Sequence, residues 1–210
     1  MKLHTNTGGP VATNGYLLAD ETTGEAAVID APHATVAPLL KVARHHGWDV
    51  KFLLLTHGHW DHVADHKVVT DAYPAAKVLI HPLDEPKLIK PVSIFMPLPF
   101  DIPPRKADAH IADGQLITVG NLQLEAMFTP GHSPGHIVFY IKDQSLLLAC
   151  DLLFAQSIGR TDLPDSSPAD MARSLKRVLQ LPDDTLVKPG HGPETTIGAE
   201  RRSNPWLEQL

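Results

Sequence analysis

Short apolar runs separated by polar turns fill the first part of the chain. Residues 15–19 and 25–30 are mostly apolar and flank a polar, turn-like segment, which predicts a hairpin. Apolar residues recur at helical spacing over residues 35–46, and Gly47 is expected to end that helix. The same criteria predict a strand over 51–55, a helix over 62–72 and a strand over 77–80.

A proline-rich segment, residues 91–104, follows these elements. Prolines occupy positions 91, 97, 99, 103 and 104. Because proline fixes φ and lacks an amide hydrogen, the segment is predicted to be an irregular loop. It is more apolar than an exposed loop usually is, through Ile94, Phe95, Met96, Leu98 and Phe100. We interpret it as a flap over the functional site or an oligomer contact, with packing against a neighbouring helix as the alternative.

The second half of the chain again predicts strands accompanied by helices. Gly120-Asn121 and Asp143-Gln144 each separate two apolar runs and predict hairpins over 116–128 and 137–149. An amphipathic helix is expected over 168–180, a last strand at 186–187 and a closing helix from about residue 198. Both halves therefore fit an α/β fold of two facing sheets with helices on both outer faces. No linker is visible, so residues 1–210 are expected to form a single domain.

Composition narrows the class of protein. Hydrophobic residues make up 43% of the 210 residues, enough for a substantial core. The net charge of −6 disfavours an electrostatic nucleic-acid binder. There is no long apolar run and no signal-peptide core, so we expect a cytoplasmic protein without a membrane span. The single cysteine, Cys150, excludes an intrachain disulfide.

Histidine is the anomalous residue type, and its clustering points to metal. The chain contains 13 histidines, and the segment Thr56-His57-Gly58-His59-Trp60-Asp61-His62 directly follows an apolar strand. Imidazole nitrogens and carboxylate oxygens are the ligands of zinc and similar first-row metals. In an extended turn His57 and His59 can face one ion, while Asp61 and His62, at the start of the next helix, can face a second. A solvated histidine-rich loop is the alternative, and four such residues after a strand disfavour it.

Three further polar residues follow predicted strands in the second half. His132 lies in a tight turn, Asp151 comes immediately after an apolar strand, and His191 follows the last strand. Ligands gather at the carboxyl ends of strands in α/β proteins, so these residues are candidates for the same site.

The combined pattern resembles the metallo-β-lactamase superfamily. Its elements are the Thr-His-x-His-x-Asp-His segment, the Gly-His pairs at 131–132 and 190–191, and Asp151 between them. Within that superfamily the chain is most similar to short glyoxalase II-like thioesterases, through residues 129–136, 157–164, 188–193, 195–198 and 200–201. The resemblance implies a four-layer αββα sandwich. It also implies one metal site of His57, His59 and His132, a second of Asp61, His62 and His191, and Asp151 bridging both.

This resemblance implies a binuclear metal-dependent hydrolase, namely a thioesterase for 2-hydroxyacyl-glutathione-type thioesters. The expected cofactors are two divalent metal ions, with zinc favoured and iron and manganese left open. Asp61 is the candidate catalytic residue, since it would bind metal and orient the nucleophile or take its proton. The expected partner is a small-molecule thioester, with neither nucleic acid nor membrane, and a homo-oligomer is left open. The sequence identifies no substrate-binding residue.

Other functions of the same family remain as alternatives. A mononuclear-iron persulfide dioxygenase or a lactonase would use the same fold, but the complete set of ligand residues favours a binuclear hydrolase. A β-lactamase is disfavoured because its second site generally uses a cysteine where this chain has Asp151. A non-enzymatic metal-binding module should lack some ligands, and none is missing. Longer glyoxalase II enzymes carry a C-terminal helical domain that helps bind glutathione, and no such domain is expected here.

Several residues depart from the family pattern or have open roles. Cys150 stands where these hydrolases commonly have glycine, and a small core residue is favoured over a metal contact. His66 and His136 are interpreted as supporting residues rather than ligands. Arg160 could bind an anionic substrate or form an internal ion pair. The remaining histidines are interpreted as surface or structural residues, namely His4, His33, His45, His46, His81 and His110.

Overall fold

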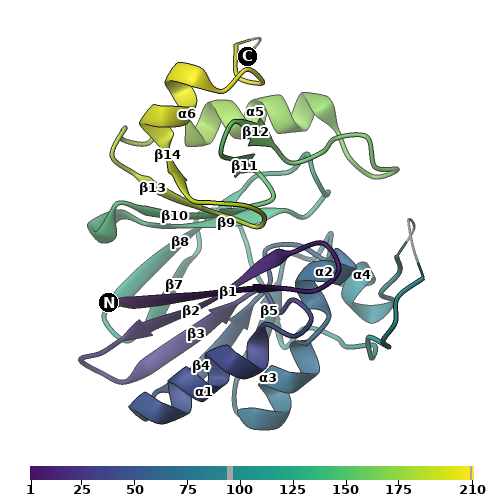
Figure 1. Cartoon of the computed structure of the whole chain (residues 1–210), viewed down its shortest axis with the longest axis vertical. Coiled ribbons are helices and arrows are strands. Elements are labelled where there is room, and N and C mark those ends of the chain that lie inside the picture. Colours follow the sequence, from purple (N-terminus) through teal and green to yellow (C-terminus); the bar gives the residue numbers. More distant parts are fainter. Residues whose placement is uncertain (94–96, 209) are drawn as a thin grey trace. The chain divides into compact units, whose positions relative to one another are not determined.

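The computed structural model describes residues 1–93, 97–208 and 210, and the chain divides into two compact units. Unit 1 comprises Met1–Ile111 and Thr118–Leu122, and unit 2 comprises Ala112–Ile117 and Gln123–Leu210. The chain therefore re-enters unit 1 for a few residues after unit 2 has begun. Each unit contains a six-stranded sheet with helices packed against it (Figure 1). No helix in the described residues is long and apolar enough to cross a membrane.

Unit 1 is built on a mixed sheet in the order β1-β2-β3-β4-β5-β6. Its first three strands pair antiparallel, and β3 to β6 pair parallel. The strands are β1 Lys2–Gly8, β2 Thr13–Asp20, β3 Glu25–Ile29, β4 Asp49–Leu54, β5 Lys77–Ile80 and β6 Ala109–His110. The helices are α1 Val36–His46, α2 Trp60–Val63, α3 His66–Ala72 and α4 Glu85–Ile89.

The helix predicted over 35–46 and the hairpin before it are confirmed, and together they form the core of unit 1. Val36, Leu39 and Leu40 of α1 are buried against Leu17 and Val28 of the sheet. Gly47 ends the helix with a left-handed φ of 67°, which a glycine adopts without steric cost. Burying a side chain of this kind stabilises the fold by roughly 1.5–3 kcal/mol, so this face holds α1 against the sheet.

The single helix predicted over 62–72 is wrong, because the chain forms two short helices there. Helix α2 ends at Val63 and α3 begins at His66. Between them, the amide of Asp65 donates to the carbonyl of Ala31, and its carboxylate accepts from the amide of Ala34. These long-range hydrogen bonds replace the helical ones. Hydrophobic periodicity along the sequence does not predict them. The break leaves α2 as a short, separately anchored helix that carries two candidate ligands.

Unit 2 is built on a second mixed sheet in the order β14-β13-β10-β9-β8-β7. Strand β10 pairs antiparallel with β9 and parallel with β13, and a separate small sheet pairs β11 with β12. The strands are β7 Leu116–Val119, β8 Leu122–Phe128, β9 Ile137–Ile141, β10 Leu146–Cys150, β11 Leu153–Phe154, β12 Ser157–Ile158, β13 Leu186–Pro189 and β14 Thr195–Thr196. The helices are the 3-10 turn η1 Lys142–Gln144, α5 Pro168–Val178 and α6 Ile197–Ser203.

The amphipathic helix predicted over 168–180 is confirmed as α5, which ends two residues earlier. Its Met171, Leu175 and Val178 are buried against Leu147 and Val187 of β10 and β13. Ser167 caps the helix, since its side chain accepts from the amide of Asp170. The two predicted hairpins and the closing helix are confirmed as well, as β7–β8, β9–β10 and α6.

The proline-rich segment contains no helix or strand in its described residues, as predicted. Ile94, Phe95 and Met96 lie outside the described residues. Phe100 stacks on His33, with ring centroids 3.9 Å apart. Nε2 of His66 hydrogen-bonds to the carbonyl of Pro103 at 2.8 Å. The described part of the loop is therefore attached to unit 1, and its role as a flap or an oligomer contact stays a prediction.

Strand β1 and helix α4 have no counterpart among the predicted elements. Strand β1 has a polar sequence and half-exposed residues, yet it pairs in continuous register with β2 from Lys2↔Ala19 to Gly8↔Thr13. As an edge strand it needs no apolar alternation, because pairing with β2 supplies its stability.

Asp20 forms a polar cluster at the end of β2. Its Oδ2 accepts hydrogen bonds from the backbone and side-chain amides of Asn121, both at 2.8 Å. The backbone amide of Thr22 donates to the other carboxylate oxygen. The bonds from the backbone of Asn121 and then of Thr22 lower the pKa of Asp20 from 3.8 to about 2. Gly120 has a φ of 60° and leaves no room for a Cβ beside this carboxylate. The tip of the β7–β8 hairpin thus belongs to unit 1 through Asp20.

Asp20→Asn is expected to reduce the loss of unfolding free energy between pH 7 and pH 3. A carboxylate with a depressed folded-state pKa contributes stability above its unfolded value of 3.8, and loses it as the pH falls through about 2. Urea unfolding of metal-free protein at pH 7 and at pH 3 measures the effect. The variant should be less stable at pH 7 and should lose less between the two pH values than wild type. Asp71→Asn, at an exposed aspartate paired with Lys67, is the control. Equal pH dependence in wild type and Asp20→Asn would contradict the assignment.

Candidate metal centre

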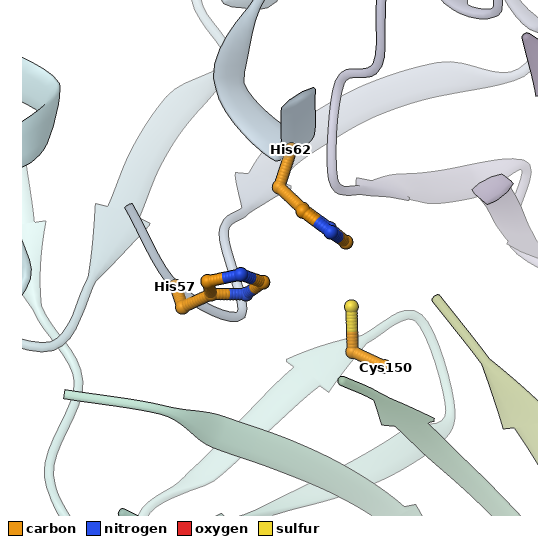
Figure 2. Close-up of side chains that lie close together, drawn as sticks. All are labelled: His57, His62 and Cys150. Atoms are coloured by element: carbon orange, nitrogen blue, oxygen red, sulfur yellow. The ribbon is translucent and has the colours of Figure 1, made fainter. Parts of the chain in front are cut away.

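Four predicted ligands lie together in unit 1, just beyond the end of β4. His57 and His62 are fully buried, and their ring centroids are 4.2 Å apart (Figure 2). His59 faces the ring of His57 edge-on at 4.6 Å. The ligand atoms of His57 and His59 lie within 4.8 Å of one another, as do those of Asp61 and His62. The turn and the first residues of α2 therefore arrange the four side chains in the two pairs that the spacing predicted.

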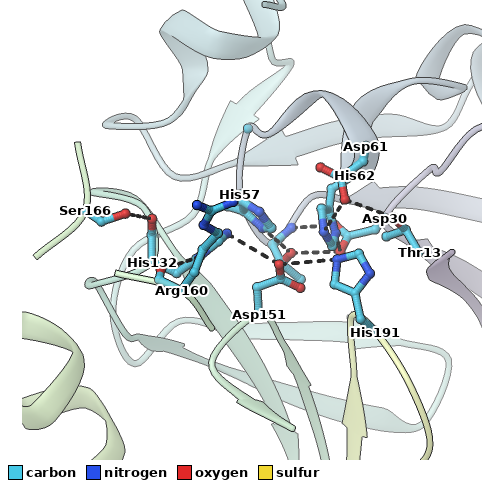
Figure 3. Close-up of polar contacts among 12 residues, drawn as sticks. Thr13, Asp30, His57, Asp61, His62, His132, Asp151, Arg160, Ser166 and His191 are labelled. Carbon is cyan, nitrogen blue, oxygen red and sulfur yellow. Dashed lines mark hydrogen bonds and ion pairs between the residues drawn. The ribbon is translucent and has the colours of Figure 1, made fainter. Parts of the chain in front are cut away.

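Asp30 orients two of these histidines from the end of β3. Its Oδ2 accepts hydrogen bonds from Nδ1 of His62 at 2.9 Å and from the hydroxyl of Thr56 at 2.8 Å (Figure 3). Thr56 Oγ1 in turn accepts from Nδ1 of His57 at 3.1 Å. Both rings donate through Nδ1, so in the neutral form of each ring the lone pair is on Nε2. Asp30 is thereby the common anchor of His57 and His62.

Asp84 fixes the turn between His57 and His59 through a hydrogen bond to its backbone. This buried carboxylate accepts the amide of Gly58 at 2.8 Å. A Cβ on Gly58 would lie 2.6 Å from the carbonyl oxygen of Asp84 and 2.7 Å from Cβ of Lys87. Only glycine fits this approach, so Gly58 is required by packing against α4 and not by its φ angle.

Asp61 is oriented by a residue of β2. The hydroxyl of Thr13 donates to Oδ2 of Asp61 at 2.9 Å, and the same oxygen lies 3.2 Å from Nε2 of His62. Thr13 is itself buried, so Asp61 is held in one orientation toward the ring of His62.

Unit 2 brings its three predicted ligands together around one carboxylate oxygen. Oδ2 of Asp151 lies 3.4 Å from Nε2 of His132 and 3.5 Å from Nε2 of His191 (Figure 3). His132 and Asp151 are buried, whereas the side chain of His191 is 27% exposed. The carboxylate of Asp151 is therefore almost equally far from the imidazoles of His132 and His191.

His132 is oriented by the backbone that follows β12. Its Nδ1 donates to the carbonyl oxygen of Arg160 at 2.9 Å. That carbonyl can come so close because the preceding residue is Gly159. A Cβ there would lie 1.8 Å from the carbonyl oxygen of Asp151 and 3.4 Å from Cβ of His132. Gly159 thus lets the chain pass between two ligand residues.

The turn that carries His132 is held by the start of α5. The hydroxyl of Ser166 donates to the carbonyl of His132, and that of Ser174 donates to the carbonyl of Pro130. Gly131 has a φ of 144°, and a Cβ on it would lie 2.5 Å from the backbone of Met171. The Gly-His pair is therefore close-packed on a helix whose position the core of unit 2 determines.

Cys150, also drawn in Figure 2, is buried and ends β10 with a φ of 44°. Its carbonyl oxygen accepts the amide of Gly190, which ties the residue before Asp151 to the residue before His191. Left-handed backbone is costly for a residue with a Cβ and free of that cost for glycine. Glycine would therefore suit this backbone better than cysteine does.

Cys150→Gly is expected to be more stable than Cys150→Ala, which reverses the usual order of these two residues. Both variants lose the buried sulfur, but only glycine removes the left-handed penalty of roughly 1–2 kcal/mol. Urea unfolding of the two variants measures the difference. Ala149→Gly is the control, compared with wild type. Ala149 lies in the same strand and has no positive φ, so glycine should lower the stability there. If Cys150→Gly is less stable than Cys150→Ala, the backbone of Cys150 is not strained.

The donor chemistry of both units fits divalent cations. In the neutral ring Nε2 of His62 and of His132 carries the lone pair, because Nδ1 donates, and each Nε2 faces a carboxylate oxygen at 3.2 Å or 3.4 Å. A lone pair and a carboxylate oxygen repel each other unless a proton or a cation lies between them. Imidazole and carboxylate donors suit zinc, iron and manganese, so these residues fit the cofactors that the sequence predicted.

The remaining candidates have structural partners. His66 is buried, and burial lowers its pKa below the ordinary value, so the ring that bonds to Pro103 is neutral at pH 7. Arg160 forms a bidentate ion pair with Asp162, with Nε 2.7 Å from Oδ1. Nδ1 of His136 bonds to the hydroxyl of Thr129. His66 is thus a support of the loop, and the ion-pair interpretation of Arg160 is confirmed.

Sequence reasoning missed the supporting residues Asp30, Asp84, Thr13 and Gly159. Asp30 carried a usable signal, since it follows the apolar strand β3 just as Asp151 follows β10. The other three have no local pattern, because each acts on a residue far away in sequence.

Known proteins place this chain in a family. The family model of the metallo-beta-lactamase superfamily matches residues 8–191. The probable metallo-hydrolase YqgX of Bacillus subtilis is 33% identical over 95% of this chain and 94% of its own length. Hydroxyacylglutathione hydrolase of Rhizobium etli is 34% identical over 84% of this chain, which spans 61% of that protein.

Solved structures agree with the sequence matches. The crystal structure of the B3 metallo-beta-lactamase BLEG-1 has a TM-score of 0.89 and 31% identity, covering 99% of this chain and all of that one. The di-iron-bound form of TTHA1623 has a TM-score of 0.84 and 36% identity, covering 97% of this chain and 100% of that one. The predicted metallo-β-lactamase fold is confirmed, and the chain belongs to the metallo-β-lactamase superfamily of metal-dependent hydrolases.

Proposed function

We propose that the chain is a binuclear metal-dependent thioesterase that hydrolyses 2-hydroxyacyl-glutathione-type thioesters. The observation that carries the proposal is the orientation of imidazole lone pairs toward carboxylate oxygens in both units, at Asp61 and at Asp151. The similarity to hydroxyacylglutathione hydrolase supports the substrate class. In this proposal His57, His59 and His132 hold one ion, Asp61, His62 and His191 hold the other, and Asp151 serves both.

The chain's own residues supply positioning and proton handling. When bound, two divalent ions lower the pKa of water and polarise a carbonyl group, which is the chemistry that thioester hydrolysis needs. Asp61, held by Thr13, is placed to orient the attacking water or accept its proton. The water oxygen bonds to the acyl carbon, the carbon–sulfur bond breaks, and the released thiolate takes up a proton from solvent.

Zinc is the proposed metal, since its usual ligands are imidazole and carboxylate groups. Iron is the competing metal, because TTHA1623 has been solved in a di-iron-bound form at 36% identity to this chain. Either ion would leave the ligand assignment unchanged.

Metal analysis and a substrate panel on one sample test the proposal. Protein purified without added metal and then reconstituted should bind about two ions per chain. Its highest kcat/KM should be for S-lactoylglutathione, in a panel with a smaller-thiol lactoyl ester, a lactone, a persulfide and a β-lactam. We expect weak discrimination between the two thiols, because the sequence identifies no residue that would bind the thiol carrier.

A histidine pair supplies the control for metal content. His132→Ala should lose at least one ion, whereas His110→Ala, at an exposed histidine paired with Glu85, should keep both. A fully active preparation with one iron per chain that oxidises persulfide would replace the thioesterase by a dioxygenase. Preferred turnover of the lactone or the β-lactam would reassign the substrate class.

A further inference from the structure

A buried carboxylate on the C-terminal helix α6 lies outside the ligand set. Glu200 is 1% exposed, and its partners are all uncharged groups of unit 2. Oε2 accepts from the backbone amide of Gln156 and from the side-chain amide of Asn204, both at 2.8 Å. Oε1 accepts from the hydroxyl of Thr195 at 2.5 Å. Burying a carboxylate costs free energy that its hydrogen bonds must offset, so the groups that donate to Glu200 are held firmly.

Helix α6 holds the turn between β11 and β12 through this glutamate. Gln156 lies in that turn with a φ of 59°, a left-handed backbone that is unfavourable for a residue with a side chain. Its amide donates to Glu200, and its side chain donates to Ser203. Asn204 also donates to the carbonyl of Ser157, the next residue of the hairpin. The turn is therefore held at Gln156 and at Ser157 by α6 and by Asn204, the residue that follows it.

The hairpin leads directly to the backbone that orients His132. Two residues after Ser157 the chain reaches Gly159, whose amide donates to the carbonyl of Leu152 at 3.3 Å. The next carbonyl, that of Arg160, accepts from Nδ1 of His132. The backbone of Gly159 is packed closely against Asp151, since a Cβ on Gly159 would lie 1.8 Å from the carbonyl oxygen of Asp151. A displacement of the hairpin would therefore be transmitted to His132.

We propose that Glu200 is a positioning residue for the metal site, acting through the β11–β12 turn and the Arg160 carbonyl on the ring of His132. The inference rests on the proposed function, since it assigns His132 as a metal ligand. It gives α6 a role in ligand geometry in addition to its contribution to the core of unit 2 through Ile197.

Cobalt binding tests this role without reference to turnover. Purified full-length chain is freed of metal, titrated with Co²⁺, and followed by its visible absorption. Glu200→Gln keeps the size of the side chain but removes its charge, and leaves one oxygen to accept from the amides of Gln156 and Asn204. We expect Co²⁺ to bind about tenfold more weakly at one of its sites, with an altered spectrum, because supporting partners of ligands usually contribute that much.

Two control variants separate positioning from general stability. Thr195→Val removes a bond to the same glutamate on the side away from the turn, and Glu208→Gln changes an exposed carboxylate of the same unit. Both should keep the wild-type spectrum, even where Thr195→Val lowers the melting temperature. Should Glu200→Gln fail to fold, Asn204→Ala replaces it, because it removes the bond to Ser157.

The outcomes distinguish the inference from the proposed function. If wild type binds two Co²⁺ ions and Glu200→Gln binds them with unchanged affinity and spectrum, Glu200 is only a stabilising residue and the inference is overturned. The same holds if Thr195→Val changes the spectrum as much as Glu200→Gln. If wild type binds no Co²⁺, the proposed function itself fails. A spectral change confined to Glu200→Gln and Asn204→Ala supports the positioning role.

Discussion

Asp151→Asn is expected to remove most of the hydrolytic activity and at least one metal ion while the fold persists. Oδ2 of Asp151 lies between Nε2 of His132 and Nε2 of His191, so it is the group best placed to serve both ions. Asparagine has nearly the same shape but no negative charge to offset two cations. Loss of a group that merely supports a ligand lowers metal affinity by about 10- to 100-fold. We therefore expect kcat/KM to fall by more than about a hundredfold, or about 2.7 kcal/mol.

Metal content, turnover and circular dichroism on the same samples check this result. Asp143→Asn makes the same chemical change in the exposed turn between β9 and β10 and should match wild type. An Asp151→Asn variant that keeps two ions and near-normal turnover would show that the bridging assignment is wrong. Loss of the native circular dichroism spectrum would instead show that the carboxylate is needed for folding.

Gly159→Ala is expected to be the most disruptive small substitution in unit 2. A Cβ at this position would lie 1.8 Å from the carbonyl oxygen of Asp151, so the backbone of one of the two segments has to move. Overpacking of this kind costs about 3 kcal/mol of unfolding free energy. The same movement would separate the Arg160 carbonyl from Nδ1 of His132, so metal affinity should fall together with stability.

Gly114→Ala is the matched control for this substitution. Gly114 has a φ of 72° with no atom within 4 Å of its would-be Cβ, so alanine costs only the left-handed penalty of about 1 kcal/mol there. The control should keep its metal content. If urea unfolding shows Gly159→Ala to be no less stable than Gly114→Ala, the backbone of Gly159 does not pack this closely against Asp151.

The ligands were predictable from sequence because each has a local pattern. His57, His132, Asp151 and His191 all follow a strand, and strands in this chain are recognisable as apolar runs. The residues that orient these ligands act over long distances in sequence. Asp30 meets His62 across 32 positions, and Asp84 meets Gly58 across 26. A single sequence gives such pairs no shared pattern.

The fold was predictable to a similar extent and for similar reasons. Apolar periodicity located α1 and α5, whose buried faces are regular. It failed for α2 and α3, where Asp65 replaces helical bonds by bonds to Ala31 and Ala34. It also failed for β1, whose stability comes from its pairing with β2 and not from its own side chains.

The hydrogen bonds of Asp20 set the order in which unit 1 can be completed during protein synthesis. Asn121 is 101 positions beyond Asp20, and Gly120, whose amide bonds to Glu25, is 95 positions beyond its partner. A ribosome adding about 5–20 residues per second therefore makes Asp20 and Glu25 several seconds before these partners. During that interval the carboxylates of Asp20 and Glu25 at the end of the first hairpin lack their bonds to the docked turn. Those charges discourage pairing with other nascent chains until the hairpin tip arrives.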